Sequence, residues 1–278
     1  PPSSLMYLDY WQLATKPFEP TADRGAFFPC ESHEAALLKL RYAVENHRGA
    51  ALLAGPAGVG KTMLVNILRN ELPDTFRPQV HLVFPQMCSR DLLVYLAEQL
   101  GAPPADPPRH TVEESVRRLE FLLRQNSEDG RHAVVVIDEA HLLEDCGALE
   151  TLRLLLNFER AGQPSLTLLL VGQMNLISAV GRLPSLEERI SVKTLVRSLT
   201  AEETARYVDH RLEAAGATRN IFTPDALEAI HYLAHGTPRQ INRLADLALL
   251  VGYADRLPQL TAQQIEAVSE ELVSIAAE

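Results

Sequence analysis

The stretch Gly55-Pro56-Ala57-Gly58-Val59-Gly60-Lys61-Thr62 decides the fold of this chain. It matches the pattern G-x-x-x-x-G-K-[ST], in which glycines let the backbone close around an anion while successive N–H groups supply positive potential. The apolar run Ala50–Ala54 before it predicts a strand, and the amphipathic stretch Thr62–Leu72 after it predicts a helix. This strand–loop–helix context favours a phosphate-binding loop over an ordinary glycine-rich turn.

The residues of this loop have separate expected roles. Lys61 is expected to reach the β- and γ-phosphates of a nucleoside triphosphate, and the Thr62 hydroxyl is expected to be a ligand of Mg²⁺. The other residues expected to surround the phosphates are Gly55, Pro56, Ala57, Gly58, Val59, Gly60 and, just after the loop, Met63. The sequence therefore predicts ATP and Mg²⁺ as cofactors.

A second motif, Val134-Val135-Val136-Ile137-Asp138-Glu139, is an apolar strand that ends in two carboxylates. Asp138 is expected to hold Mg²⁺ through its water shell, and Glu139 to polarise the water that attacks the γ-phosphate. A base for water favours hydrolysis over phosphoryl transfer, so the chain is predicted to be an ATPase. The string Asp138-Glu139-Ala140-His141 also occurs in one helicase class, but those helicases carry two tandem motor domains, and no second sheet is expected after residue 198.

Strand and helix signals alternate up to about residue 198. The five apolar runs are Ala50–Ala54, Val80–Phe84, Ala133–Ile137, Leu166–Val171 and the weaker Ile190–Val196. Near-continuous apolar strands separated by helices indicate a parallel sheet buried on both faces. After Thr200 only helical patterns follow, with a capping box at Thr200 and Glu203. We therefore predict an irregular N-terminal segment (1–31) packed on the ATPase core, an α/β nucleotide-binding domain (32–198) and a helical lid (199–278).

Composition limits the classes of function. The 278 residues are 46% hydrophobic and 22% charged, which excludes a disordered or collagen-like chain. The 36 acidic residues exceed the 26 basic ones, giving a net charge of −10, so a surface that coats nucleic acid indiscriminately is not expected. Three widely spaced cysteines favour a reducing compartment, and no apolar run is long enough to span a bilayer. The expected location is cytoplasmic.

Four polar residues beyond these motifs are candidates for the nucleotide site. Gln173 follows the run Leu166–Val171, where an amide can orient a water or sense a phosphate. Three arginines, Arg182, Arg189 and Arg239, offer guanidinium groups that match phosphate geometry. Most such residues lie on protein surfaces, so the residues alone leave their roles open.

The order of these motifs resembles an AAA+ ATPase of the P-loop NTPase class, with a five-stranded parallel sheet followed by a small helical lid. The finer resemblance is to the ExeA/GspA-type ATPases of the general secretion pathway, and it covers residues 6 to 270. It is carried by Met6–Trp11, Lys16–Phe18, Ser32–Leu37, Leu40–Val44, Leu152–Glu159, Val171–Gln173 and Gly236–Leu244.

The resemblance implies a role for each candidate. Gln173 resembles the first sensor residue, and Arg239 resembles the lid arginine that contacts the γ-phosphate of its own subunit. Arg189 resembles the arginine finger that enters a neighbour's site, with Arg182 as the alternative. Pro17, Phe18 and Ile241 would frame the adenine. A finger supplied in trans implies assembly of the chain with itself, as a ring or filament.

Three biological roles stay open at this stage. Secretion-type members assist envelope assembly, and they often continue into a membrane helix and a peptidoglycan-binding domain. Similar ATPase domains regulate transposition and assemble on duplex DNA; the 278 residues contain neither of those extra regions, which favours this alternative. The third role, a switch that binds ATP without hydrolysing it, is disfavoured by Glu139.

Overall fold

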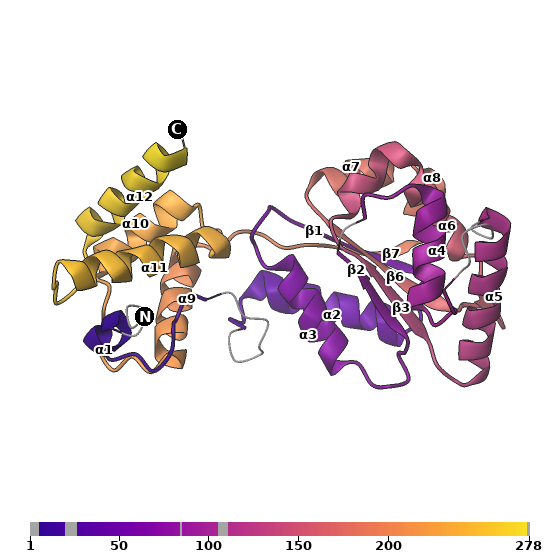
Figure 1. Ribbon diagram of the computed structural model, residues 1–278, viewed down its shortest axis with the longest axis horizontal. Helices are drawn as coiled ribbons and strands as arrows, with labels where there is room; N and C mark the ends of the chain where they lie inside the picture. Colours follow the sequence, from indigo (N-terminus) through magenta and orange to yellow (C-terminus); the bar gives the residue numbers. More distant parts are fainter. Residues whose placement is uncertain (1–5, 20–26, 84, 105–110, 277–278) are drawn as a thin grey trace. The chain divides into compact units, whose positions relative to one another are not determined.

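The computed structural model (Figure 1) describes residues 6–19, 27–83, 85–104 and 111–276, with only the backbone described for 144–146 and 273–276. Contacts divide the chain into two units, which we call the helical unit and the sheet unit. The helical unit consists of Pro1–Cys30, Gly58–Gly60 and Arg197–Glu278, and the sheet unit consists of Glu31–Ala57 and Lys61–Val196.

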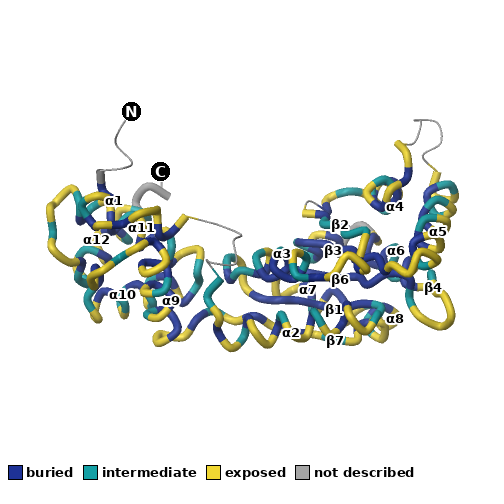
Figure 2. The backbone as a smooth tube through the Cα atoms, turned by 90° about the horizontal axis from the view of Figure 1, so that it is seen from below, coloured by how far each residue is buried: buried dark blue, intermediate teal, exposed yellow. Residues whose placement is uncertain are grey.

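The sheet unit contains the five-stranded parallel sheet that the sequence predicts. Its strands are β1 (Ala50–Ala54), β2 (Gln79–Leu82), β3 (Ala133–Ile137), β6 (Leu166–Gly172) and β7 (Ile190–Leu195). They lie in the order β2-β3-β6-β1-β7, and every neighbouring pair is parallel. Every residue of β1, β3 and β6 is buried, as the dark tube in Figure 2 shows, which explains why these strands read as unbroken apolar runs. The fold prediction is confirmed.

Helices cover both faces of this sheet. One face packs in a single apolar core against η3 (Ala140–Cys146) and the helices α4 (Ser89–Gln99), α5 (Val112–Glu128), α6 (Ala148–Leu155), α7 (Asn175–Gly181) and α8 (Pro184–Glu187). The helices α2 (Glu31–Glu45) and α3 (Lys61–Glu71) contact β1, β6 and β7. Alternate residues of a strand face opposite sides, so the central strands need apolar side chains at every position.

Helix α2 begins at Glu31 and carries Glu31 and Glu34 in its first turn, where carboxylates are favourable. Helix α6 ends at Leu155. Beyond it, β4 (Glu159–Arg160) and β5 (Gln163–Pro164) form a hairpin whose turn residues both have positive φ, 52° at Ala161 and 78° at Gly162.

The helical unit contains α1 (Met6–Trp11), α9 (Ala201–Ala214), α10 (Pro224–Ala234), α11 (Pro238–Ala254) and α12 (Ala262–Ala276). The N-terminal segment belongs to this unit and includes a helix, so the prediction that it is irregular and packs on the ATPase core needs correction. The physical reason is Trp11, which is fully buried and donates its indole N–H to the Leu249 carbonyl at 2.8 Å. Buried Arg211 also donates to the carbonyl of Pro17 at 2.6 Å. Within the described ranges, no helix is long and apolar enough to cross a membrane.

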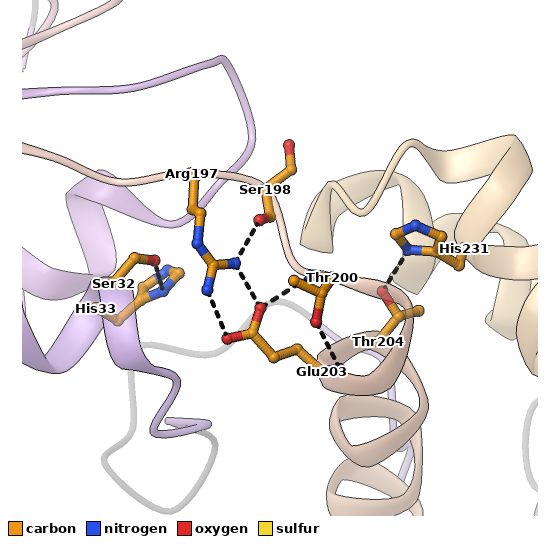
Figure 3. Close-up of polar contacts among 8 residues, drawn as sticks. All are labelled: Ser32, His33, Arg197, Ser198, Thr200, Glu203, Thr204 and His231. Carbon is orange, nitrogen blue, oxygen red and sulfur yellow. Dashed lines mark hydrogen bonds and ion pairs between the residues drawn. The ribbon is translucent and has the colours of Figure 1, made fainter.

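Helix α9 begins with the predicted capping box (Figure 3). The Thr200 hydroxyl accepts from the Glu203 N–H, and the Glu203 carboxylate accepts from the Thr200 N–H. Arg197 donates to both Glu203 oxygens, at 2.6 and 3.0 Å. These bonds, with the Arg197 bond as the largest cause, lower the pKa of the Glu203 carboxyl to about 2, although burial acts in the opposite direction.

Acidification should therefore weaken the start of α9. Because the pKa of Glu203 is lower in the folded chain than its ordinary 4.5, its stabilising contribution is complete above pH 4.5 and is lost as the pH falls towards 2. Glu203→Gln should cost about 1 kcal/mol at pH 7, typical of a weakened cap, and should lower the melting temperature. Calorimetry from pH 7 to pH 3 should show this difference shrinking, with exposed Glu202→Gln as the matched control. A difference that stays constant would contradict the role of the charge.

Candidate functional site

The predicted phosphate loop connects β1 to α3 in the conformation that its glycines require. Gly58 and Gly60 have φ values of +79° and +100°, which L-amino acids with a side chain rarely adopt. Lys61 is the first residue of α3, so the loop leads directly into a helix N-terminus. The N–H groups and the helix dipole at a helix N-terminus favour an anion.

The Lys61 ammonium lies folded back onto the loop. Its Nζ donates to the Gly55 carbonyl at 3.0 Å and to the Pro56 carbonyl at 2.8 Å. Lys61 is buried, with only 6% of its surface exposed. A buried ammonium is strongly desolvated, and it is stable here because carbonyl oxygens replace water. Phosphate oxygens are stronger acceptors for the same hydrogens.

Thr62 and Asp138 meet at the carboxyl edge of the sheet, as the sequence predicts for two metal ligands. The Thr62 hydroxyl donates to Asp138 Oδ2 at 2.7 Å, and the Glu139 N–H donates to Asp138 Oδ1 at 2.9 Å. Burial by itself raises the pKa of Asp138, but its contacts with His81, Thr62 and the Glu139 N–H together outweigh burial and lower it. Asp138 is therefore an ionised carboxylate inside the protein.

His81, on β2, completes the surroundings of Asp138. Its Nε2 lies 3.7 Å from Asp138 Oδ2, too far for a hydrogen bond but close enough for electrostatic attraction. Its Nδ1 lies 3.0 Å from Arg69 Nη1. A guanidinium can only donate, so Nδ1 must be an acceptor and a neutral His81 carries its hydrogen on Nε2, facing Asp138. Arg69 thereby fixes the tautomer of His81.

This donor set fits Mg²⁺. A hydroxyl and a carboxylate are hard oxygen donors, and Mg²⁺ in phosphate sites is held by one or two such groups together with phosphate oxygens and water. Thr62 and Asp138 supply these groups beside the loop. In the part of the chain that the structure describes, no cluster of three or more His, Cys, Asp or Glu side chains could hold a metal by itself.

Glu139 directly follows Asp138 and has a left-handed backbone, with φ 51° and ψ 34°. Such a conformation is costly for a residue with a side chain and is often found where a site constrains the chain. Its Oε2 lies 3.3 Å from His141 Nδ1. Gln173, at the end of β6, donates its backbone N–H to the same His141 Nδ1 at 3.4 Å. The structure therefore brings together Glu139, His141 and the backbone of Gln173, while the Gln173 residue as a whole is exposed.

The arginine candidates lie elsewhere. Arg189 comes just before β7, at the amino edge of the sheet, and donates to Glu159 at 3.2 Å and Asn157 at 3.1 Å. The loop follows β1 at the opposite, carboxyl edge. Arg182 is the C-cap residue of α7. Arg239, at the start of α11, is exposed, and its backbone N–H donates to the Gly58 carbonyl at 3.3 Å within the helical unit.

The remaining candidates have structural explanations. Met63 is a half-buried residue in the first turn of α3. Phe18 and Ile241 are buried in the core of the helical unit, and the Pro17 carbonyl accepts from Arg211. The roles of Pro17, Phe18 and Ile241 at the adenine, and of Met63 at the phosphates, stay predictions.

Sequence reasoning missed His81, Arg69 and His141. His141 belongs to the string Asp138-Glu139-Ala140-His141, whose resemblance to a helicase motif says nothing about a role for the imidazole here. The signal that could have found it is its position two residues after Glu139, at the edge where parallel strands end. His81 lies one residue before the end of β2, next to β3, whereas nothing in the sequence pairs it with Arg69.

Comparisons with known proteins agree with the fold. Residues 44–179 match the family model described as "AAA domain". A curated relative, General secretion pathway protein A of Aeromonas hydrophila, is 33% identical over 256 residues, which are 90% of this chain and 45% of the relative. The chain thus spans about half the length of that relative.

Solved structures share the architecture at lower identity. The Aeropyrum pernix ORC2 protein in ADPNP–ADP complexes is 18% identical with a TM-score of 0.67, covering 92% of this chain and 71% of that one. Drosophila ORC bound to DNA is 16% identical with a TM-score of 0.70, over 98% and 67%. The Thermotoga maritima RuvB Holliday junction branch migration motor is 20% identical with a TM-score of 0.61, over 92% and 73%. These likenesses show the fold, and the chain is similar to an AAA domain over residues 44–179 and to General secretion pathway protein A over 90% of its length.

Proposed function

We propose that this protein is an ATPase that binds Mg-ATP at the loop Gly55–Thr62 and hydrolyses it. The observation that carries the proposal is the 2.7 Å contact between the Thr62 hydroxyl and the buried carboxylate of Asp138, beside the Lys61 ammonium and one residue before Glu139. Two oxygen donors, a cation and a candidate base stand together at one edge of the sheet. Matches to an AAA domain and to a secretion-pathway protein support the same function.

Each side chain has a defined part in the reaction. Lys61 would exchange its two carbonyl partners for β- and γ-phosphate oxygens, and Thr62 and Asp138 would hold Mg²⁺. When bound, Mg²⁺ neutralises phosphate charge and polarises the bond that breaks. Glu139 takes a proton from a water molecule. The oxygen of that water bonds to the γ-phosphorus, while the bond between the γ-phosphorus and the bridging oxygen of ADP breaks. ADP and inorganic phosphate leave.

Assembly of the chain with itself is part of the proposal. Arg189 lies at the edge of the sheet opposite the loop, so it is badly placed for the phosphates of its own subunit, which is compatible with a role at the phosphates of a neighbour. Its ion pair with Glu159 and its bond to Asn157 hold it there in the single chain. A guanidinium donated across an interface would stabilise the charge that develops on the γ-phosphate.

Removing this guanidinium should lower activity only in the assembled protein. Arg189→Ala should bind ATP normally and hydrolyse it about 10–100-fold more slowly at high protein concentration, as expected for one lost charge-assisted hydrogen bond. Mixing it with Lys61→Ala subunits should restore part of the activity, because the latter still supply Arg189. Arg182→Ala is the matched comparison for the alternative finger. Normal hydrolysis by Arg189→Ala at high concentration would contradict a finger role.

The process that uses the ATP is proposed to be assembly of a larger envelope complex, in the cytoplasm and with secretion proteins as partners, since the chain is similar to General secretion pathway protein A. The alternative is a regulator of transposition that assembles on duplex DNA. The two roles differ in ATP-dependent binding to duplex DNA over a salt series. A steep loss of affinity with salt supports the DNA role, and no binding at low salt supports the assembly role.

A further inference from the structure

His141 occupies the space between two residues of the proposed site. It lies near the start of η3, and its side chain is 10% exposed. Its approach to the end of β6 depends on Gly172: a Cβ added there would lie 3.3 Å from His141 N and 3.3 Å from His141 Nδ1, as well as 3.0 Å from Leu176 Cδ2. Glycine at this position therefore lets an imidazole approach the last residues of the strand closely.

One nitrogen of this imidazole faces two partners. Nδ1 lies 3.3 Å from Glu139 Oε2 and 3.4 Å from the backbone nitrogen of Gln173. In a neutral imidazole, Nδ1 either accepts from the Gln173 N–H or donates its own hydrogen to Glu139, and it cannot do both. In the structure the hydrogen bond runs from Gln173 to Nδ1.

The consequence falls on Glu139. Its Oε2 is buried and makes no hydrogen bond within the described part of the chain, although Nδ1 is its near neighbour. A buried carboxylate oxygen without a donor is unusual and needs a reason. While Nδ1 accepts from Gln173, the Glu139 carboxylate receives no hydrogen from His141 and keeps its full strength as a base, and 42% of its side chain is exposed. If Nδ1 turned its hydrogen to Oε2, that oxygen would be a weaker acceptor.

We propose that His141 is a positioning residue for Glu139, and that its Nδ1 is shared between Glu139 and the Gln173 backbone so that the end of β6 controls the availability of the carboxylate. When Gln173 shifts away from Nδ1, the imidazole can give its Nε2 hydrogen to solvent water and take a hydrogen from water at Nδ1, which then donates to Glu139; the return of Gln173 reverses this exchange. The proposal rests on the proposed ATPase function and deepens it. The imidazole of His141 then has two discrete arrangements, and these would couple the position of Gln173 to the state of Glu139.

The first test compares two substitutions. His141→Ala should lower kcat about 10–100-fold, while KM for ATP stays within about twofold. Effects of this size are seen when a residue that orients a metal ligand is removed. His141→Asn, whose amide lies near the former Nδ1 and can both accept and donate, should stay within about threefold of the original kcat. A raised KM with unchanged kcat, or an asparagine variant as slow as the alanine variant, would overturn the proposal.

The second test asks whether His141 acts through Glu139. In a Glu139→Gln background, adding His141→Ala should change the residual rate by less than about twofold, because residues that act as one unit are not additive. The same loss in both backgrounds would show that the two act independently and would overturn the proposal.

The third test needs no hydrolysis, so it separates this proposal from the proposed function. Nitrogen-15 NMR of the nucleotide-free protein should show His141 with its hydrogen on Nε2, and amide exchange at Gln173 should be slower in the original chain than in His141→Ala. A hydrogen on Nδ1, or equal exchange in both, would overturn the shared contact. A chain that gives the expected spectra but does not hydrolyse ATP would overturn only the ATPase function.

Discussion

Replacing Lys61 with alanine is expected to abolish ATP hydrolysis and to weaken ATP binding by about 100-fold or more. The ammonium is the only part of this side chain that can bind phosphate, and each hydrogen bond to a charged group contributes about 1.5–3 kcal/mol. Two such bonds are already directed at the mouth of the loop, to the carbonyls of Gly55 and Pro56. Equilibrium binding of a fluorescent ATP analogue measures the effect.

The control for this experiment must separate binding from folding. Lys61→Ala also removes the donor of the two loop carbonyls, so its melting temperature has to be compared with that of the original chain. Lys61→Arg keeps a cation but replaces a compact ammonium by a planar group that does not fit the same two acceptors, and it should bind ATP poorly while melting normally. Lys39→Ala, on the exposed side of α2, should change neither quantity. Unchanged ATP affinity in a folded Lys61→Ala protein would remove the phosphate-loop assignment.

Glu139→Gln is expected to lower kcat about 10³–10⁴-fold while ATP binding is kept. The substitution keeps size and shape and removes the negative charge that accepts a proton from water, and general bases contribute up to this range. Glu139 has a left-handed backbone that glutamine tolerates about as well as glutamate, so the local fold should survive. Single-turnover hydrolysis with bound ATP measures the rate without contributions from product release.

The matched control is Glu128→Gln at the exposed end of α5, which removes the same charge far along the chain from the site. It should hydrolyse ATP at the original rate. An intact rate in Glu139→Gln would show that another group, or water alone, accepts the proton. ATP-bound Glu139→Gln should also accumulate as an oligomer, because the state that precedes hydrolysis is no longer consumed.

Much of the sheet unit could be predicted from the sequence because its strands are buried on both faces. A strand such as Ala133–Ile137 leaves no polar position to confuse its limits, and predicted and observed bounds coincide. The loop Gly55–Thr62 was predictable because backbone conformation alone demands its glycines. The hairpin at Glu159–Pro164 was not, because its strands have two residues each and are largely exposed.

The N-terminal segment and the residues around Asp138 and Glu139 were harder to predict from the sequence, for a different reason. Trp11 packs against a carbonyl 238 positions away, and no local pattern reports such a partner. Arg69, His81 and His141 act through pairs from separate elements, and single-sequence reasoning sees each of them as one ordinary polar residue. Candidates for the ligands could be proposed from the sequence because metal and phosphate chemistry restricts which residue types can serve.

Helix α3 links two properties of the site that are usually discussed apart. It carries Lys61 and Thr62 at its start and Arg69 about two turns later, and Arg69 keeps the hydrogen of a neutral His81 on the nitrogen that faces Asp138. A rotation of this single rod about its axis would therefore change the phosphate ligand, the metal ligand and the polarity around the acid in one movement. Helix α3 therefore couples the phosphate ligand to the metal ligand. Substitutions that alter its pitch, even far from the loop, should change affinity for nucleotide and for cation in step rather than separately.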